Sequence, residues 1–476
     1  MATKTLLEQF LSRENFIRAY RRIAGKNASG GIDRVSVEDF ARHLDRNIQK
    51  LQKQIIEGQY TPQPVKSVHI PKFNQENEWR ELGLPAVADK IVQTALLQAV
   101  EPIAEKLFLD TNYGYRPGKG HYKAIRRVEH NLKNRHKTWI VHRDIDNFFD
   151  TLNHDLLLSR FSDLVKGEPI LTELVALWCR MGLVEKNGRW RNVEAGVRQG
   201  HVISPFLANL YLHTLDEFVT EFDIGWVRYA DDYLIQCSSK EDVVEVDENV
   251  IAFLKNNLSL SINNNPNPVS NLEGGFTFLG VYFCGEKRSI AAAKLDKIHR
   301  KIKWLSSDKR SQTPEAFMLR IDKMLQGLKR YYGFLNPVEQ FSEIDKMVEN
   351  EIVPFIANHI KKGQWPQKPP AGFLHCFQDG KPVLVYDLIE EFRAMAVDRG
   401  IFTLLHRGEK LTQEDDGALS SETRKKIARI VIGRLSSETY LSGSRMILED
   451  VIREQALNIK KHVTGTSNYK PFLSRW

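Results

Sequence analysis

The sequence has little cysteine: only Cys179, Cys237, Cys284 and Cys376 occur among its 476 residues. None of them forms a C-x-x-C pair, so the sequence indicates neither a zinc ribbon nor a disulfide framework. This usage is typical of a protein of the reducing cytoplasm, which is the location we expect.

Long apolar runs are absent as well. No run approaches the roughly 20 residues of a membrane-spanning helix. Residues 1–15 contain acids and no long apolar core, which excludes a signal peptide. With 42% hydrophobic and 27% charged residues, the composition predicts a globular protein with no membrane association. A net charge of +8 favours a polyanionic partner.

Two adjacent carboxylates stand at the centre of the stretch GWVRYADDYLIQC, Gly225–Cys237. Strand-forming residues flank them, so the stretch predicts a β-hairpin with Asp231 and Asp232 at its tip. Two buried acids side by side repel each other unless a cation lies beside them, and a divalent cation is the usual one. The alternative is a solvated turn, the commoner state of an isolated Asp–Asp pair.

A third carboxylate is available in the stretch TWIVHRDIDNFF, Thr138–Phe149, which predicts a buried strand. Asp144 and Asp146 are two residues apart on this strand and therefore share a face. One acid on a strand and two on a hairpin suit two-metal phosphoryl transfer, in which two Mg²⁺ ions lie about 3.5–4 Å apart. Mg²⁺ takes few protein carboxylates and shares the phosphate oxygens of the substrate.

A basic hairpin is predicted nearer the N-terminus, from Val65–Pro71 and Trp79–Pro85. It carries Lys72 on one arm and Arg80 on the other, and two cations on facing strands can grip a triphosphate. A solvent-facing basic hairpin is the alternative. Combined with three acids, a triphosphate grip points to a polymerase rather than a hydrolase.

Further cations are predicted to contact nucleic acid. The loop NYGYRPGKG interleaves aromatic residues, glycines and the cations Arg116 and Lys119, which suits a loop that contacts a nucleic-acid backbone. Two later helices carry cations outside their apolar stripes and predict a duplex-binding thumb, because phosphates need distributed cations. A merely solvated face is the alternative. The thumb cations assigned to the duplex are Arg300, Lys301, Lys329 and Arg330.

Six motifs, taken in order, resemble those of group II intron-like reverse transcriptases. They are IPK with a following Arg-x-Leu-Gly-Leu-Pro, then YGYRPG, DIDNFFD, RQG with SPFLANLYL, YADD and FTFLGVYF. The resemblance implies an α+β right-hand polymerase with fingers, a ferredoxin-like palm and a helical thumb. It implies an RNA-directed DNA polymerase, a nucleotidyltransferase that uses two Mg²⁺ ions, with Mn²⁺ as a substitute.

The resemblance also assigns roles to individual residues. The expected metal ligands are the catalytic acids Asp144, Asp231 and Asp232 together with the backbone carbonyl of Ile145. The expected dNTP contacts are Lys72, Arg80, Phe149, Gln199 and Gly200. Phe149 would block a 2′-hydroxyl, while Gln199 and Gly200 would border the nascent base pair. The hairpin Phe276–Phe283 would be the primer grip.

Three positions depart from the family pattern. Arg198 stands where a proline is common, and Asp146 stands where a basic residue is often found. The segment Leu258–Val269 lacks the lysine that is a candidate proton donor to pyrophosphate. These departures concern rate and fidelity rather than the metal site.

The C-terminal segment resembles the helical part of the CRISPR spacer integrase through GFLH, YDLIEEFR and the ending YKPF. The resemblance implies an all-α module and a second metal site at His375 and Asp387, with Glu390 one helical turn further on. The sequence contains neither the integrase's N-terminal β-domain nor a clear match for its further glutamate. The alternative is therefore a helical module that binds nucleic acid or a partner without cutting.

The expected domains are N-terminal helices and fingers at 1–120, a palm with finger elements at 121–290, a thumb at 291–362 and the integrase-like module at 363–476. The expected function is extension of a DNA or RNA primer with dNTPs on an RNA template, in prokaryotic antiphage defence with a dedicated non-coding RNA. One alternative is a CRISPR adaptation enzyme that acquires spacers from RNA. Another is a maturase-like RNA-binding scaffold. A CRISPR integrase and a second copy of the chain are the protein partners considered.

Overall fold

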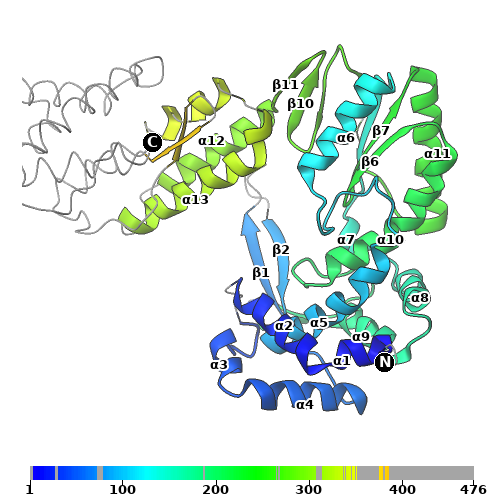
Figure 1. The fold of residues 1–476 in the computed structure, drawn as a ribbon, viewed down its shortest axis with the longest axis vertical. Helices are drawn as coiled ribbons and strands as arrows, with labels where there is room; N and C mark the ends of the chain where they lie inside the picture. The colour runs from blue at the N-terminus through cyan, green and yellow to red at the C-terminus, as the bar shows by residue number, and fades with distance from the viewer. Residues whose placement is uncertain are drawn as a thin grey trace, which may run out of the picture. The chain divides into compact units, whose positions relative to one another are not determined.

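The computed structural model is shown in Figure 1. It describes residues 4–26, 30–71, 79–185, 188–263, 265, 268–306, 314–335, 337, 339–344, 346–348, 350, 375–378 and 381–384. The chain divides into two compact units, Met1–Lys287 and Arg288–Trp476, each of which is treated by itself. Within the described part of the chain, no helix has the length and apolar character that a membrane crossing requires.

Four short helices form the N-terminal part, where the apolar spacing predicts two longer ones over residues 4–24 and 35–54. They are α1 (Leu6–Leu11), α2 (Arg13–Ala24), α3 (Val37–Ala41) and α4 (Leu44–Ile56). The first break occurs at Ser12, whose side chain accepts a hydrogen bond from the backbone N–H of Asn15 and caps α2. Apolar spacing alone does not reveal this break, because the stripe continues across the cap.

The basic hairpin is confirmed as a pair of antiparallel strands, β1 (Val65–Pro71) and β2 (Trp79–Leu84), with Ile70 opposite Arg80. Two short strands, β4 (Leu183–Val184) and β5 (Trp190–Arg191), extend it to a sheet of order β2-β1-β4-β5. The next helix, α5 (Val87–Ala104), is largely buried, and its residues join the hydrophobic core. This core also includes Phe10 and Leu260, so the expected fingers–palm boundary at residue 120 does not break it.

A second antiparallel sheet has the order β6-β7-β3-β8. Its strands are β3 (Trp139–Asp144), β6 (Gly225–Tyr229), β7 (Asp232–Cys237) and β8 (Val269–Asn271). Between β3 and β6 lie α7 (Phe148–Thr151), α8 (His154–Leu164), α9 (Pro169–Arg180), α10 (Ser204–Phe218) and η1 (Val219–Glu221). With α11 (Lys240–Leu258) after β7, the order β3-α10-β6-β7-α11-β8 is that of a split βαβ unit.

Helices cover both faces of this sheet (Figure 1). On one face, Arg143 of β3 binds Asp247 of α11, with 3.1 Å between Nε and Oδ1. On the other, Asn131 of α6 (His121–Asn134) donates to Gln236 of β7 at 2.9 Å. Asp144 lies next to Arg143 along the strand, so its side chain points to the α6 face. Asp144 and Asp232, which lies directly opposite it, therefore lie on the face away from α11.

The first unit ends with the hairpin of β9 (Phe276–Phe278) and β10 (Val281–Cys284), followed by β11 (Lys287–Ile290) at the division between the units. In the second unit, α12 (Ala292–Ser306) packs against α13 (Pro314–Tyr332), and η2 (Gly333–Leu335) follows. The predicted pair of basic helices is thus confirmed as secondary structure.

The C-terminal module is not all-α within the described residues. Strands β12 (His375–Gln378) and β13 (Lys381–Leu384) pair in antiparallel fashion, with Gln378 opposite Lys381. The sequence signal was the Asp-Gly dipeptide between them, which favours a two-residue hairpin loop. The expectation of an all-α module is therefore wrong for this segment, while the remaining predicted helices lie outside the described residues.

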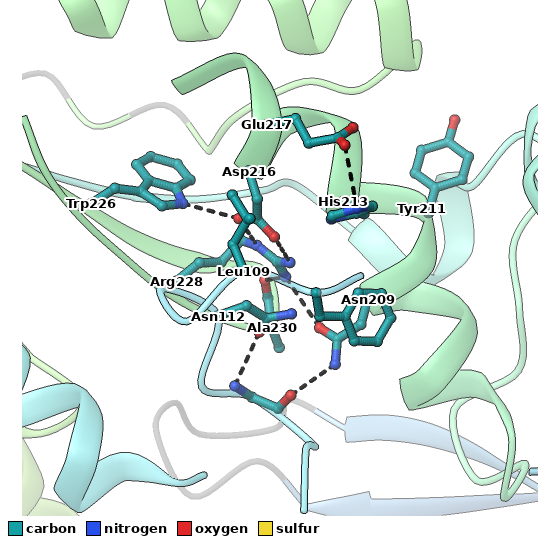
Figure 2. A network of polar contacts seen from close by, with 12 residues as sticks. Leu109, Asn112, Asn209, Tyr211, His213, Asp216, Glu217, Trp226, Arg228 and Ala230 are labelled. Atoms are coloured by element: carbon teal, nitrogen blue, oxygen red, sulfur yellow. Dashed lines mark hydrogen bonds and ion pairs between the residues drawn. The ribbon is translucent and has the colours of Figure 1, made fainter. Parts of the chain in front are cut away.

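A buried ion pair lies beside Ala230, the residue before Asp231 (Figure 2). Arg228 of β6 and Asp216 of α10 are both fully inaccessible, and the guanidinium Nε donates to Asp216 at 2.8 Å. Another guanidinium nitrogen donates to the carbonyl of Ala230 at 2.9 Å and to Asn209 at 3.2 Å. The pair thus connects the helix to the backbone of the turn.

Replacing Arg228 with leucine leaves Asp216 buried without its countercharge. We expect this to reduce the free energy of unfolding by about 3–5 kcal/mol. The measurement is the shift of the first transition in urea or thermal unfolding of the full chain.

The matched control is Arg13→Leu, which removes an arginine from the exposed pair with Asp45 at 2.6 Å. We expect about 0–1 kcal/mol for this exposed pair. Equal shifts for the two variants would contradict a special contribution of the buried pair.

Candidate active site

The hairpin of β6 and β7 brings the three candidate acids to one place. Asp144 at the end of β3 lies directly opposite Asp232 at the start of β7. In an antiparallel pair, opposed side chains have Cβ atoms about 4.5–5.5 Å apart. Asp231 is the last residue of the turn, and its carbonyl accepts a hydrogen bond from the Ile145 N–H at 3.3 Å. The confirmed hairpin thus brings Asp231 and Asp232 close to Asp144.

The turn requires an unusual backbone conformation. Ala230 has a φ of 62°, in the left-handed region that non-glycine residues rarely adopt. The Arg228 guanidinium donates a hydrogen bond to the Ala230 carbonyl, as described above, and this bond compensates for the backbone strain. Asp231 and Asp232 follow Ala230 directly in the chain. The ion pair therefore fixes the backbone position from which both carboxylates extend.

Burial and neighbouring carboxylates raise the pKa of two of these acids. Burial, and then the Asp144 carboxylate, raises the pKa of Asp231 to about 6. Burial and the Asp232 carboxylate also raise the pKa of Asp144, against the opposing effect of a hydrogen bond from Asn263. This is the electrostatic condition that a bound divalent cation would relieve.

Two partners of these acids were missed by sequence reasoning. His142 of β3 lies with its Nε2 2.5 Å from an Asp232 carboxylate oxygen, and its ring packs edge-on against Phe278 at 5.6 Å. Asn263 donates its side-chain N–H to Asp144 at 2.8 Å, and its backbone N–H to the Asp144 carbonyl at 2.9 Å. Strand periodicity places His142 on the face of Asp144, but no local signal pairs Asn263 with an acid 119 residues away.

Burial acts to lower the pKa of His142, but the hydrogen bond and charge of Asp232 outweigh it and raise that pKa. The ring therefore favours donation of a proton to the Asp232 carboxylate. This contact orients Asp232 through the packing of His142 against β9.

A cavity of about 500 Å³ opens beside the acids. Asp144 and Asp231 line it, as do four of the residues considered above, namely Arg80, Phe149, Gln199 and Ile145. Arg198 and Asn263 line it as well. The structure therefore brings most of the expected dNTP contacts to one cavity, and adds a second arginine to it.

Gly200 is not among the residues that line this cavity. It has a φ of 109°, and a Cβ on it would lie 2.3 Å from the Gly83 carbonyl oxygen of β2. The neighbouring Gln199 carbonyl accepts a hydrogen bond from the Gly83 N–H at 2.7 Å. Glycine at this position therefore allows the loop to pack against β2, while the expected place of Gly200 beside the nascent base pair stays a prediction. Lys72, the other expected grip, lies outside the described residues.

The donor set has the chemistry that Mg²⁺ prefers, because all three candidate ligand side chains are carboxylates. Among the residues that the structure describes, however, no group of three or more His, Cys, Asp or Glu side chains is arranged to hold a metal ion by itself. Mg²⁺ is commonly held by one or two carboxylates plus substrate phosphates. Asp144, Asp231 and Asp232 fit such a shared site rather than a closed protein cage.

The expected nucleic-acid contact of Arg116 is wrong. Its side chain is buried, pairs with Glu105 at 3.0 Å, and donates to the carbonyls of Phe108, Leu109 and Asn112. A guanidinium with its donors used in this way cannot serve a phosphate. Lys119 pairs with Asp110 at 2.7 Å and retains some exposure. The composition of the loop does not distinguish the buried Arg116, which anchors the loop, from the more accessible Lys119.

The four thumb cations lie on α12 and α13 of the second unit. Arg300 and Arg330 are exposed, whereas Lys301 and Lys329 are half-buried, and Lys329 lies over the ring of Phe341 at 5.9 Å. His375 lies in β12, while Asp387 and Glu390 lie outside the described residues. The second metal site therefore stays a prediction.

Comparisons with known proteins agree with the order of these segments. The family model described as reverse transcriptase (RNA-dependent DNA polymerase) matches residues 70–283. That of the group II intron maturase-specific domain matches residues 295–369, and that of the CRISPR associated protein Cas1 matches residues 367–431.

Two curated relatives and one solved structure are similar to the chain. Protein YkfC of Escherichia coli K12 is 30% identical over 289 residues, which cover 52% of this chain and 74% of YkfC. The group II intron-encoded protein LtrA of Lactococcus lactis is 30% identical over 227 residues, 47% of this chain and only 37% of LtrA. A structure of a partial Cas6-RT-Cas1–Cas2 complex has a TM-score of 0.33 at 23% identity, covering 54% of this chain and 43% of its own. That structural likeness is too low to support an argument.

The raised pKa of Asp231 predicts a stability difference in protein freed of divalent cations. Its ordinary pKa of 3.8 rises to about 6 on folding, so the folded state binds more protons between these values. The contribution of Asp231 to stability therefore falls as pH rises from about 4 to 6, by on the order of 3 kcal/mol. Asparagine cannot ionise and avoids this cost. We expect Asp231→Asn to unfold at higher urea than wild type at pH 7, and the gap to close toward pH 4.

Asp155→Asn is the control, because Asp155 is an exposed acid on α8. It should leave the pH dependence unchanged. A stability gap between wild type and Asp231→Asn that stays the same from pH 4 to pH 7 would contradict the assignment to Asp231.

Proposed function

The chain belongs to the reverse transcriptase family of RNA-directed DNA polymerases, and we propose that it extends a primer with two Mg²⁺ ions at Asp144, Asp231 and Asp232. The observation that carries this proposal is the placement of Asp144 directly opposite Asp232, with Asp231 and Asp144 lining one cavity. Mg²⁺, when bound, would make the primer 3′-hydroxyl a better nucleophile and stabilise the departing pyrophosphate. Mn²⁺ has the same ligand preferences and can substitute.

The acids would divide the work of holding the metals. Asp144 and Asp231 face the cavity, while Asp232 lies beside them and is oriented by His142. We propose the Ile145 carbonyl as a further ligand, because Ile145 also lines the cavity. The His142 contact occupies one Asp232 oxygen, which leaves the other free toward a cation.

The cavity residues would bind the incoming dNTP. Arg80, with Lys72 from the other arm of the hairpin, would contact the triphosphate, because planar guanidinium donors suit phosphate oxygens. Phe149 would lie against the sugar and exclude a 2′-hydroxyl. Gln199 would border the nascent base pair. Arg198, the departure from the family pattern, adds a charge to the same cavity.

We further propose the right-hand arrangement, with the basic hairpin among the fingers, the split βαβ unit as palm and the second unit beginning with the thumb. Arg300, Lys301, Lys329 and Arg330 would contact the template–primer duplex through phosphates. The template would be RNA, and the primer DNA or RNA.

The biological setting is proposed to be antiphage defence, with a dedicated non-coding RNA as template. CRISPR adaptation is a second candidate, favoured by the Cas1 match over residues 367–431. In that case the C-terminal module would act beside a CRISPR integrase, and His375, Asp387 and Glu390 would be its metal site. Repeat arrays and a complete integrase in the gene neighbourhood would distinguish the second setting from the first.

A maturase-like scaffold needs no polymerase activity, so primer extension separates it from the leading proposal. We expect wild-type protein with Mg²⁺ to incorporate dNTPs on an RNA template. Asp231→Ala should lose activity by at least about 100-fold, because two-metal catalysis depends on the carboxylates. Asp155→Ala should retain wild-type activity. No incorporation by wild type on RNA, on DNA or on its co-purified RNA would contradict the polymerase proposal.

The Phe149 assignment is tested by sugar selectivity. Phe149→Ala removes the ring that would meet a 2′-hydroxyl, so we expect kcat/KM for ribonucleotides to rise relative to deoxynucleotides by on the order of 10- to 100-fold. The measurement is single-nucleotide incorporation with matched rNTP and dNTP on one template. Phe161→Leu is the control, since Phe161 is a buried phenylalanine that does not line the cavity. Equal selectivity in wild type and Phe149→Ala would contradict the assignment.

A further inference from the structure

The loop Thr111–Arg116 packs through its backbone against the end of β6 and against the catalytic turn, Ala230–Asp231. The Tyr113 N–H donates to the Arg228 carbonyl at 2.8 Å, and the Arg228 N–H donates to the Thr111 carbonyl at 2.9 Å. A Cβ on Gly114 would lie 2.4 Å from the backbone nitrogen of Ala230, so only glycine allows this approach. The loop and the turn therefore hold a fixed relative position.

The same loop is anchored from its other end. Arg116 is buried and bonded to Glu105 and to backbone carbonyls, as described above. Asn209 of α10 donates to the Gly114 carbonyl at 2.8 Å. Tyr115 stands between these two anchored residues, so its backbone has little freedom.

Tyr115 is held in an unfavourable conformation and yet exposes its ring. Its φ is 56°, in the left-handed region that costs a bulky residue about 1–2 kcal/mol. Its exposed fraction is 53%, so ring burial does not repay that cost. A strained backbone that presents an aromatic side chain to solvent points to a ligand.

The ring lies next to the chemistry. Its centroid is 6.4 Å from that of Tyr229, which precedes the Ala230–Asp232 turn. Asp231 and Arg80 both act electrostatically on the Tyr115 phenol. Neither Tyr115 nor Tyr229 lines the cavity that Asp231 shares with Arg80 and Phe149.

Asp231 thus lines the cavity and also lies close enough to the Tyr115 phenol, outside that cavity, to act on it electrostatically. In phosphoryl transfer, the attacking and leaving oxygens are roughly in line, so nucleophile and triphosphate approach from opposite sides. If the cavity takes the triphosphate, the two tyrosines border the side from which a 3′-hydroxyl must enter. Aromatic faces bind nucleotides with little regard to base identity, as a primer end requires.

We propose that Tyr115, supported by Tyr229, is a contact surface for the 3′-terminal nucleotide of the primer. The proposal rests on the polymerase function proposed above and identifies a substrate contact of that site. The loop that sequence composition assigned to nucleic acid would thus act through its tyrosine, while Arg116 acts as its anchor.

The test compares Tyr115→Ala and Tyr115→Phe in the full chain. Binding of a labelled primer–template with a recessed 3′ end is measured by fluorescence anisotropy without dNTP, and KM is measured separately for duplex and dNTP. We expect Tyr115→Ala to weaken duplex binding and raise duplex KM by about tenfold, with dNTP KM little changed. Tyr115→Phe should behave as wild type, because the ring face makes the contact.

Tyr122→Ala is the matched control, since Tyr122 is a similarly exposed tyrosine on α6 with 45% exposure. It should leave duplex binding unchanged. If Tyr115→Ala fails to fold, Tyr115→Asn removes the ring with a residue type that tolerates the left-handed region.

Two results would overturn the proposal: unchanged duplex affinity in the folded variant lacking the ring, or an increase in dNTP KM alone. Failure of the polymerase function looks different. Wild type would then incorporate no dNTP, whatever Tyr115 does to duplex binding, and Asp231→Ala would resemble wild type.

Discussion

The buried pair of Arg228 and Asp216 is the interaction on which the rest of the site depends. One guanidinium joins α10 to β6, holds the carbonyl of the strained Ala230, and shares Asn209 with the loop that carries Gly114. Asp231 and Asp232 begin where this network ends. A buried ion pair adds little net stability compared with apolar packing, because desolvation offsets the attraction. We therefore attribute to it the specification of one turn geometry rather than a gain in stability.

The clustered acids destabilise the fold, in contrast to the ion pair that specifies its geometry. Burial raises the pKa of both Asp144 and Asp231, and a neighbouring carboxylate adds to the rise in each case, Asp232 for Asp144 and Asp144 for Asp231. The folded chain therefore carries an electrostatic cost in the absence of a cation. His142 and Asn263 reduce this cost by hydrogen bonding to the carboxylates. Each also connects an acid to another part of the first unit, β9 or the segment after α11. Orientation and charge compensation are thus provided by the same two side chains.

The sequence predicted the parts of this site that have local signals. Strand-forming residues around Asp231 and Asp232 predicted the hairpin, and motif order placed Asp144 beside it. The break at Ser12 was missed because a capping serine does not interrupt an apolar stripe. Arg116 was misassigned because burial of a cation depends on Glu105 and distant carbonyls, which composition does not encode. Asn263 could not be found, since its contact with Asp144 spans two elements and has no spacing rule.

Close approach of backbone to backbone explains how the site leaves its side chains available. Gly114 lies against Ala230, and Gly200 lies against Gly83, in each case at a distance that any Cβ would prevent. These contacts fix the turn and the loop of Gln199 without using the carboxylates, Arg80 or the ring of Tyr115. Side chains freed from holding the fold can then meet a substrate from both sides of Asp231. A larger residue at either glycine should therefore disturb the geometry of catalysis even though neither glycine carries a functional group.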